Sequence, residues 1–227
     1  MKHTKALLAL ATTLIAGLFA AQAQDAPKRV GDPYPLATCP VTGRPVADAS
    51  TVTADGREVK FCCPNCIATF NADPKVYLDK LDAAIIDDQM KVYPRHATCV
   101  VMTDEELSDP LGPDAADAKP LVVGNRLFRI CCKKCIAKIK KDPQKFLATL
   151  DAQVMAAQKA DYPLTTCVVT GEVLDDGAYD FVVSNRLVRT CCKKCAEKIL
   201  ANPVEAIKKI DAARASTASA SKAASAK

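Results

Sequence analysis

The chain has 227 residues, 5% of them aromatic and none tryptophan, and its formal net charge is +5. Lysine and arginine are scattered rather than clustered, and so small a positive excess does not predict a nucleic-acid-binding protein. Few aromatic side chains leave little material for a large core. Length alone would suggest one or two ordinary domains, but an internal repeat overrides that expectation.

The first 23 residues have the pattern of a secretory signal peptide. Lys2 and Lys5 precede an uncharged apolar run from 6 to 20, and Ala21-Gln22-Ala23 has the form of an A-x-A cleavage site. The run is shorter than the roughly 20 apolar residues that a spanning helix needs. We therefore expect cleavage, a mature chain that starts at Gln24, a secreted or periplasmic location, and no stable membrane insertion afterwards.

The 12 cysteines fall into three groups of four. In each group a lone cysteine is followed, after a gap, by a C-C-x-x-C cluster that packs three thiols into about one helical turn. The lone cysteines are Cys39, Cys99 and Cys167, and the clusters are Cys62, Cys63 and Cys66, then Cys131, Cys132 and Cys135, then Cys191, Cys192 and Cys195. Thiolates gathered in this way are ligands for Zn²⁺ and Cu⁺, so all 12 are candidate metal ligands.

The repeat is wider than the cysteine groups. Each copy has Tyr-Pro before its lone cysteine, and Asp-Pro or Asn-Pro with an amphipathic run after its cluster. This pattern predicts three modules, which we call module 1, module 2 and module 3, at 34–90, 93–160 and 162–213. The Ala/Ser/Lys-rich end, 215–227, has no periodicity, and we expect it to be a disordered tail.

Each module predicts the same α+β arrangement. A turn holds the lone cysteine, a β-hairpin leads into the cluster, a short helix starts inside the cluster, and a second helix follows. The hairpin turns are Asp55-Gly56, Gly124-Asn125 and Ser184-Asn185, whose residues suit the positive φ that tight hairpins require. A knuckle, a hairpin and a helix converging on one ion form a treble-clef-like site, so we expect three such modules in tandem.

A disulfide-stapled structural or interaction protein without metal is the alternative. Modules this small usually need a staple, and zinc can supply about 10–16 kcal/mol of apparent binding energy against about 2–4 kcal/mol for a disulfide. An exported protein meets an oxidising compartment, which favours disulfides. Three thiols within five residues nevertheless suit distant cross-links poorly, so the spacing favours metal.

Two further features are weaker candidates for functional sites, a C-x-x-C motif and a histidine. The C-x-x-C of Cys63 and Cys66 is a redox motif only in a thioredoxin-like βαβ context, which is absent from the sequence pattern, so we expect no enzyme. His96 lies three residues before Cys99 but has no counterpart in the other modules, and we interpret it as a surface-loop residue.

Module 1 carries a resemblance to a known family. Its sequence Cys39-Pro40-Val41-Thr42-Gly43, then Val59-Lys60-Phe61-Cys62, Cys66, Phe70, and Asp73-Pro74 through Tyr77-Leu78 resembles a YHS domain and the related TRASH-type heavy-metal-binding domains. The resemblance implies a treble-clef-like fold and a role in metal trafficking, resistance or sensing. It also implies that the ligands follow one Cys, a gap, then C-x-x-x-C, which excludes Cys63, Cys132 and Cys192 from the family pattern.

Module 3 keeps the Val-Thr-Gly of module 1, whereas module 2 departs from the pattern. Module 2 lacks the glycine after its lone cysteine, and its gap from Cys99 to Cys131 is 32 residues, against 23 and 24 in the other modules. The sequence therefore predicts an exported protein that binds Zn²⁺ or Cu⁺, with no identified protein partner.

Overall fold

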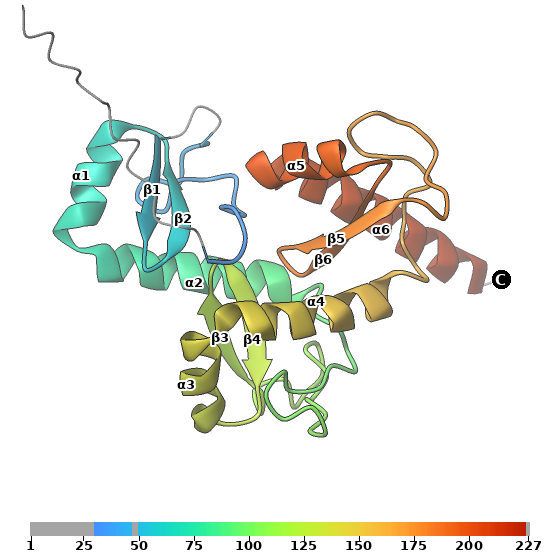
Figure 1. Ribbon diagram of the computed structural model, residues 1–227, viewed down its shortest axis with the longest axis horizontal. Coiled ribbons are helices and arrows are strands. Elements are labelled where there is room, and N and C mark those ends of the chain that lie inside the picture. The colour runs from blue at the N-terminus through green and yellow to red at the C-terminus, as the bar shows by residue number, and fades with distance from the viewer. Residues whose placement is uncertain (1–29, 47–49, 226–227) are drawn as a thin grey trace, which may run out of the picture.

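The computed structural model describes residues 30–46 and 50–225 (Figure 1). The expected signal peptide lies outside these ranges. Within them, no helix combines the length and the apolar character that crossing a membrane requires.

The same four elements occur three times along the chain. Module 1 contains β1 (Ser50–Ala54), β2 (Arg57–Phe61), α1 (Pro64–Ala72) and α2 (Pro74–Met90). Module 2 contains β3 (Lys119–Val123), β4 (Arg126–Ile130), α3 (Lys133–Lys141) and α4 (Pro143–Gln158). Module 3 contains β5 (Tyr179–Val183), β6 (Arg186–Thr190), α5 (Lys193–Ala201) and α6 (Val204–Ser225). The predicted α+β class with three repeated modules is confirmed, while the module boundaries themselves remain predictions.

Each strand pair is an antiparallel hairpin closed by two residues with positive φ. The φ angles are 50° and 71° at Asp55 and Gly56, and 57° and 62° at Gly124 and Asn125. Glycine, asparagine and aspartate tolerate this region best, so the turn residues fix the register and deliver the end of the second strand to the cysteine cluster.

The second helices of modules 1 and 2 begin at an aspartate cap followed by proline, whereas α6 of module 3 begins at Val204, one residue after Pro203. The Asp73 carboxylate accepts a hydrogen bond from the backbone N–H of Val76, and Asp142 accepts one from Lys145 in the same way. Proline occupies the first turn of both helices, where its missing N–H has no helical partner to lose.

The second helix of one module packs on the hairpin of the next. Helix α2 contacts β3 and β4, and α4 contacts β5 and β6. As a result the hydrophobic cores reach across the modules: Ile86 and Met90 of α2 pack against the core of module 2, and Val182 of β5 belongs to that same core. Figure 1 shows α2 and α4 lying between successive hairpins. The modules therefore share packing surfaces and are not structurally independent of one another.

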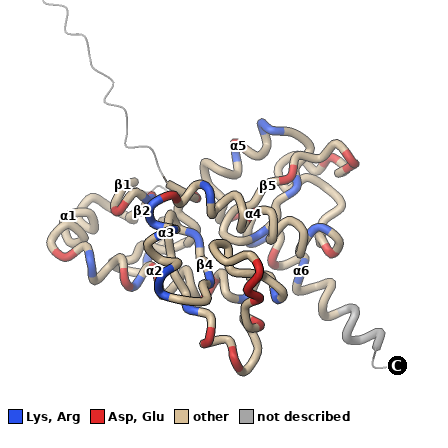
Figure 2. The backbone as a smooth tube through the Cα atoms, turned by 60° about the horizontal axis from the view of Figure 1, so that its bottom comes forward, with Lys and Arg blue, Asp and Glu red and all other residues tan. Residues whose placement is uncertain are grey.

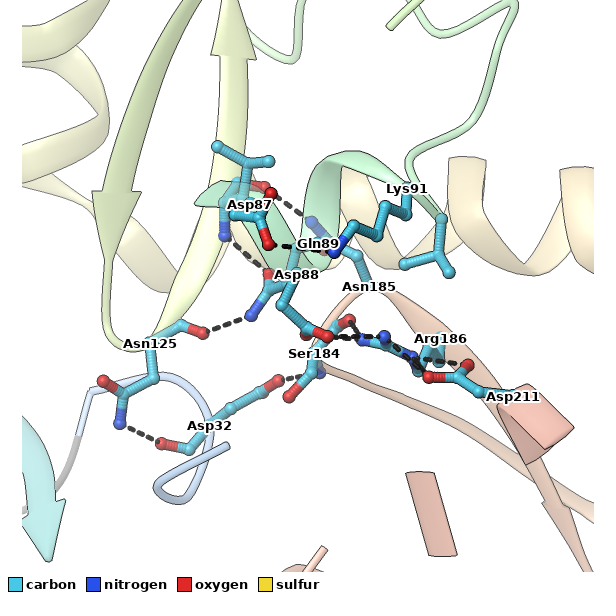
Figure 3. A network of polar contacts seen from close by, with 12 residues as sticks. Asp32, Asp87, Asp88, Gln89, Lys91, Asn125, Ser184, Asn185, Arg186 and Asp211 are labelled. Carbon is cyan, nitrogen blue, oxygen red and sulfur yellow. Dashed lines mark hydrogen bonds and ion pairs between the residues drawn. The ribbon is translucent and has the colours of Figure 1, made fainter. Parts of the chain in front are cut away.

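A buried polar junction ties the three modules together (Figure 3). Asp32 accepts hydrogen bonds from the backbone N–H of Ser184 and from the Arg126 guanidinium, so the segment before module 1 contacts the hairpins of both later modules. Arg186 of module 3 pairs with Asp88 of α2 and with Asp211 of α6. Buried charges are tolerated only when they are paired, so these contacts fix how the modules face one another.

The C-terminal segment differs from the expectation of disorder. Helix α6 continues through 215–225, the described part of the expected tail, and the C-terminal end of the chain lies beyond it (Figure 1). Alanine has the highest helix propensity, and the hydroxyls of Ser216 and Ser219 donate to the carbonyls of Ala212 and Ala215. Composition was therefore a misleading guide here, because an alanine-rich stretch can continue a helix that packing has already nucleated.

Candidate metal centres

The lone cysteine of module 1 lies in a tight knuckle. The Cys39 N–H donates to the Arg44 carbonyl at 2.8 Å, and the Gly43 N–H donates back to the Cys39 carbonyl at 2.8 Å. Gly43 has a φ of 72°, which explains why glycine stands there. Module 3 repeats this turn with Cys167, whose N–H donates to Glu172 at 2.7 Å.

Module 2 closes its knuckle differently. The Cys99 N–H donates to the Glu105 carbonyl at 2.9 Å, and the flanking bridge joins Thr98 to Glu106. The corresponding bridge in module 1 joins Thr38 to Pro45, so the module 2 turn is one residue longer. The extra residue lets the chain reverse without the glycine that the other two knuckles use, and Cys99 still reaches its cluster.

In each module three sulfur atoms converge. The knuckle cysteine, the residue after the second strand and the third residue of the first helix place their Sγ atoms within 4.8 Å of one another. The triads are Cys39, Cys62 and Cys66; Cys99, Cys131 and Cys135; and Cys167, Cys191 and Cys195. The knuckle cysteine and the helix cysteine are buried in every triad, and the middle one is half-buried. Three convergent thiols at these separations are close enough to hold a metal ion.

The remaining cysteine of each cluster lies beside the triad. Cys63, Cys132 and Cys192 are the N-cap residues of α1, α3 and α5, and their side chains make no capping hydrogen bond. Their Sγ atoms lie 3.5, 3.5 and 3.7 Å from the buried helix cysteine of the triad, but outside the set of mutually close sulfurs. All 12 cysteines are free thiols.

The knuckle lowers the pKa of its cysteine. Burial alone would raise the pKa of Cys39, but hydrogen bonds from the backbone N–H groups of Cys62, Thr42 and Val41 lower it to about 7. The same balance lowers the pKa of Cys167 to about 6, with the N–H of Cys191 as the leading donor. The direction is the same at Cys99. Backbone amides that converge on one atom form an anion-binding nest, which favours the metal-ligating form.

The buried helix cysteine has the opposite shift. Burial, together with hydrogen bonding to the neighbouring cysteine sulfurs that favours the protonated form, raises the pKa of Cys66 to about 12. The pKa values of Cys135 and Cys195 are raised too, again with burial as the main cause. Each triad therefore combines a cysteine whose pKa is lowered with one whose pKa is raised, and a bound cation would have to displace the proton of the second.

Threonine supports two of the three triads. The Oγ1 of Thr42 lies 3.3 Å from the Cys62 sulfur, and that of Thr170 lies 3.5 Å from the Cys191 sulfur. The residue pattern alone does not assign Thr42 and Thr170 a role, although the Val-Thr-Gly shared by modules 1 and 3 is the sequence signal for them. No equivalent threonine contact to Cys131 occurs in the described ranges, so the centre of module 2 differs in its surroundings.

Charged residues near the centres are solvent-exposed. Lys133 and Lys134 are exposed, as are Lys193 and Lys194, and Figure 2 shows positive and negative residues interspersed over the molecule. His96 is also exposed, and its Nδ1 lies 3.3 Å from a Glu106 carboxylate oxygen, outside the cysteine triads. The structure thus supports the interpretation of His96 as a surface-loop residue.

The chain matches no family model, no curated protein and no solved structure. Its class is therefore defined by its own geometry. It is a cysteine-rich α+β protein with three tandem modules, and each module has a thiol triad compatible with metal binding.

Proposed function

We propose that this protein is an exported metal-binding protein that takes up one Zn²⁺ or Cu⁺ per module. Its role would be trafficking, sequestration or resistance, in keeping with the metal-handling role that the resemblance to YHS and TRASH domains implies. The observation that carries the proposal is the recurrence of the triad: a cysteine 23 to 32 residues upstream meets two others within 4.8 Å, three times over.

The donor chemistry fits a soft or borderline cation. Every candidate ligand is a sulfur, and sulfur donors suit Cu⁺ and Zn²⁺ better than they suit Mg²⁺ or Ca²⁺. The knuckle cysteines lose their protons more readily than ordinary thiols, because the backbone amides lower the pKa of Cys39 and Cys167. A bound ion would also link the knuckle to the hairpin and the helix, and so would stabilise each small module.

The proposed activity is binding rather than turnover. The export signal at 1–23, which supports a secreted or periplasmic location, lies outside the described residues and rests on sequence alone. Elemental analysis combined with thiol counting, on protein purified from its own compartment, measures both the metal content and the oxidation state of the cysteines. We expect about one metal ion per module and cysteines in the reduced form, whereas metal-free, fully oxidised protein would contradict the proposal.

The alternative, a disulfide-stapled protein without metal, keeps one observation in its favour. The sulfurs of Cys62 and Cys63 lie 3.6 and 3.5 Å from that of Cys66, so modest side-chain movement could bring a pair to bonding distance. Circular dichroism separates the two functions. A strong chelator alone should unfold a metal-held module, and added metal should refold it, whereas a disulfide-held module should respond to reductant only.

A further inference from the structure

Each module holds a fourth thiol in the same place, directly before its first helix. The residues are Cys63, Cys132 and Cys192, and all three have an extended backbone, with φ between −163° and −155°. In each case the carbonyl of this residue accepts a hydrogen bond from the N–H of the buried helix cysteine, at 3.1 to 3.2 Å. The backbone therefore fixes where the fourth side chain starts, while nothing holds its thiol as a cap.

The fourth thiol is more exposed than the buried helix cysteine of its triad. Cys132 and Cys192 are exposed and Cys63 is half-buried, whereas Cys66 is only 4% exposed. The fourth sulfur is nevertheless within 3.7 Å of a triad sulfur in every module. A ligand in this position is accessible to an arriving ion or acceptor and can still touch an ion held by the triad.

The triads do not need a fourth sulfur to close. Three thiolates already surround one point, and a thiolate-bound Cu⁺ can accept a further thiolate while it releases another. A purely structural four-cysteine zinc site would instead bring four sulfurs to mutual contact distance, because such sites are closed and tetrahedral. In every module three sulfurs lie mutually within 4.8 Å, and the fourth lies beside the helix cysteine but outside that set.

We propose that Cys63, Cys132 and Cys192 are exchange thiols that pass the metal ion between the buried triad and an incoming acceptor ligand. This inference rests on the proposed metal-binding function. During unloading, the fourth cysteine loses its proton and forms a metal–sulfur bond, while one triad bond breaks and that sulfur takes a proton. The acceptor ligand then displaces the remaining protein sulfurs in turn, each displaced sulfur takes a proton from solvent, and no electron is transferred.

The test compares equilibrium binding with transfer rate. A variant with Cys63→Ser, Cys132→Ser and Cys192→Ser is loaded with Cu⁺, and transfer to excess bicinchoninate is followed by stopped-flow absorbance. We expect it to bind three equivalents with an affinity within about threefold of the wild type. We expect transfer to be about tenfold slower, because the low-barrier route for the ion has been removed.

A matched pair in module 1 controls for a new serine at the start of α1. Cys63→Ser should slow about one third of the transfer amplitude, since only one of three sites is affected, whereas Asn65→Ser, at an exposed and uncharged position two residues later, should leave all phases unchanged. Both substitutions leave the triad of Cys39, Cys62 and Cys66 intact.

The outcomes separate this inference from the function on which it rests. Equal affinity with an unchanged transfer rate would overturn the exchange role and leave the binding function standing. A loss of affinity of about 100-fold in the serine variant would show a resident fourth ligand, and would also overturn it. A wild-type protein that takes up neither Cu⁺ nor Zn²⁺ would remove the proposed function and this inference together.

Discussion

The side-chain amide of Gln89, near the end of α2, donates a 2.8 Å hydrogen bond to the backbone carbonyl of Asn125, in the hairpin turn of the next module. The Gln89 carbonyl oxygen accepts a second 2.8 Å bond from the N–H of Leu127. Gln158, near the end of α4, repeats both contacts with Asn185 and Leu187, at 2.9 Å each. A buried glutamine therefore joins each module to its successor, and the linkage is as periodic as the cysteines.

Replacing one of these glutamines should lower the stability of the protein. Gln158→Leu would leave the buried Asn185 carbonyl and Leu187 N–H without these partners, and should lower the free energy of unfolding by about 2–4 kcal/mol. Urea denaturation at a fixed metal load measures it. The matched control is Gln144→Leu, on the exposed face of the same helix, where we expect a change within about 0.5 kcal/mol. Equal effects at the two positions would show that the linkage does not contribute to stability.

The buried polar junction should also contribute to stability. Arg186 is 2% exposed and pairs with Asp88 and Asp211, so Arg186→Met would leave two carboxylates without their cation. We expect a loss of about 1–3 kcal/mol, because the hydrogen bonds of the buried guanidinium are lost, while the two carboxylates, 32% and 36% exposed, regain part of their hydration. Arg95→Met, which removes an exposed arginine 3.6 Å from Asp109, should cost under about 1 kcal/mol by thermal or urea unfolding. A stable, fully folded Arg186→Met protein would contradict the role assigned to the junction.

Metal affinity should rise with pH. The raised pKa of Cys66, about 12 through burial and neighbouring thiols, means that this thiol carries a proton at neutral pH that the metal must displace. Because protons compete with the cation, affinity should fall as pH falls, by about tenfold per pH unit for each proton released. Competition titrations at pH 6, 7 and 8 measure the slope. An affinity that is constant across this range would mean that binding displaces no thiol protons.

The threonine beside two of the triads should tune only those sites. Thr42→Val keeps the side-chain shape but removes the hydroxyl 3.3 Å from the Cys62 sulfur. Losing a partner of a ligating group typically weakens metal affinity by about 10–100-fold, so one of the three binding steps should weaken by that order. Thr51→Val, on the exposed side of β1, serves as the control. Uniform weakening of all three steps would point to a general loss of stability instead.

The repeated modules and their order of elements could be read from sequence because the determinants are local. Turn residues such as Gly124 and Asn125 specify a hairpin, and Asp142 followed by proline specifies a helix start, whatever lies elsewhere. The cysteine spacing likewise anticipated three convergent sets. What spacing could not decide was which three of the four sulfurs lie mutually within 4.8 Å, because Cys62 and Cys63 are adjacent in the chain and both lie beside Cys66.

The contacts between modules were not predictable in the same way. Asp32 and Ser184 are 152 residues apart, and the role of Gln89 depends on a hairpin that follows 36 residues later. Nothing in the local pattern of α2 distinguishes a buried glutamine that meets two backbone groups from a solvated one. Similarly, the alanine-rich end of α6 has no amphipathic period, so its helix follows from propensity and from the preceding packed turns rather than from a buried face.

The most direct test is the metal stoichiometry of the reduced chain from Gln24 onward. Titration with Cu⁺ or Zn²⁺, followed by competition with a chelator of known affinity, should saturate at about three equivalents, one for each cysteine triad. Serine in place of Cys66 should reduce the tight stoichiometry to about two equivalents, because it removes a buried member of one triad only. Saturation at one equivalent, or no tight binding by the fully reduced protein, would contradict the proposal that each module binds its own metal ion.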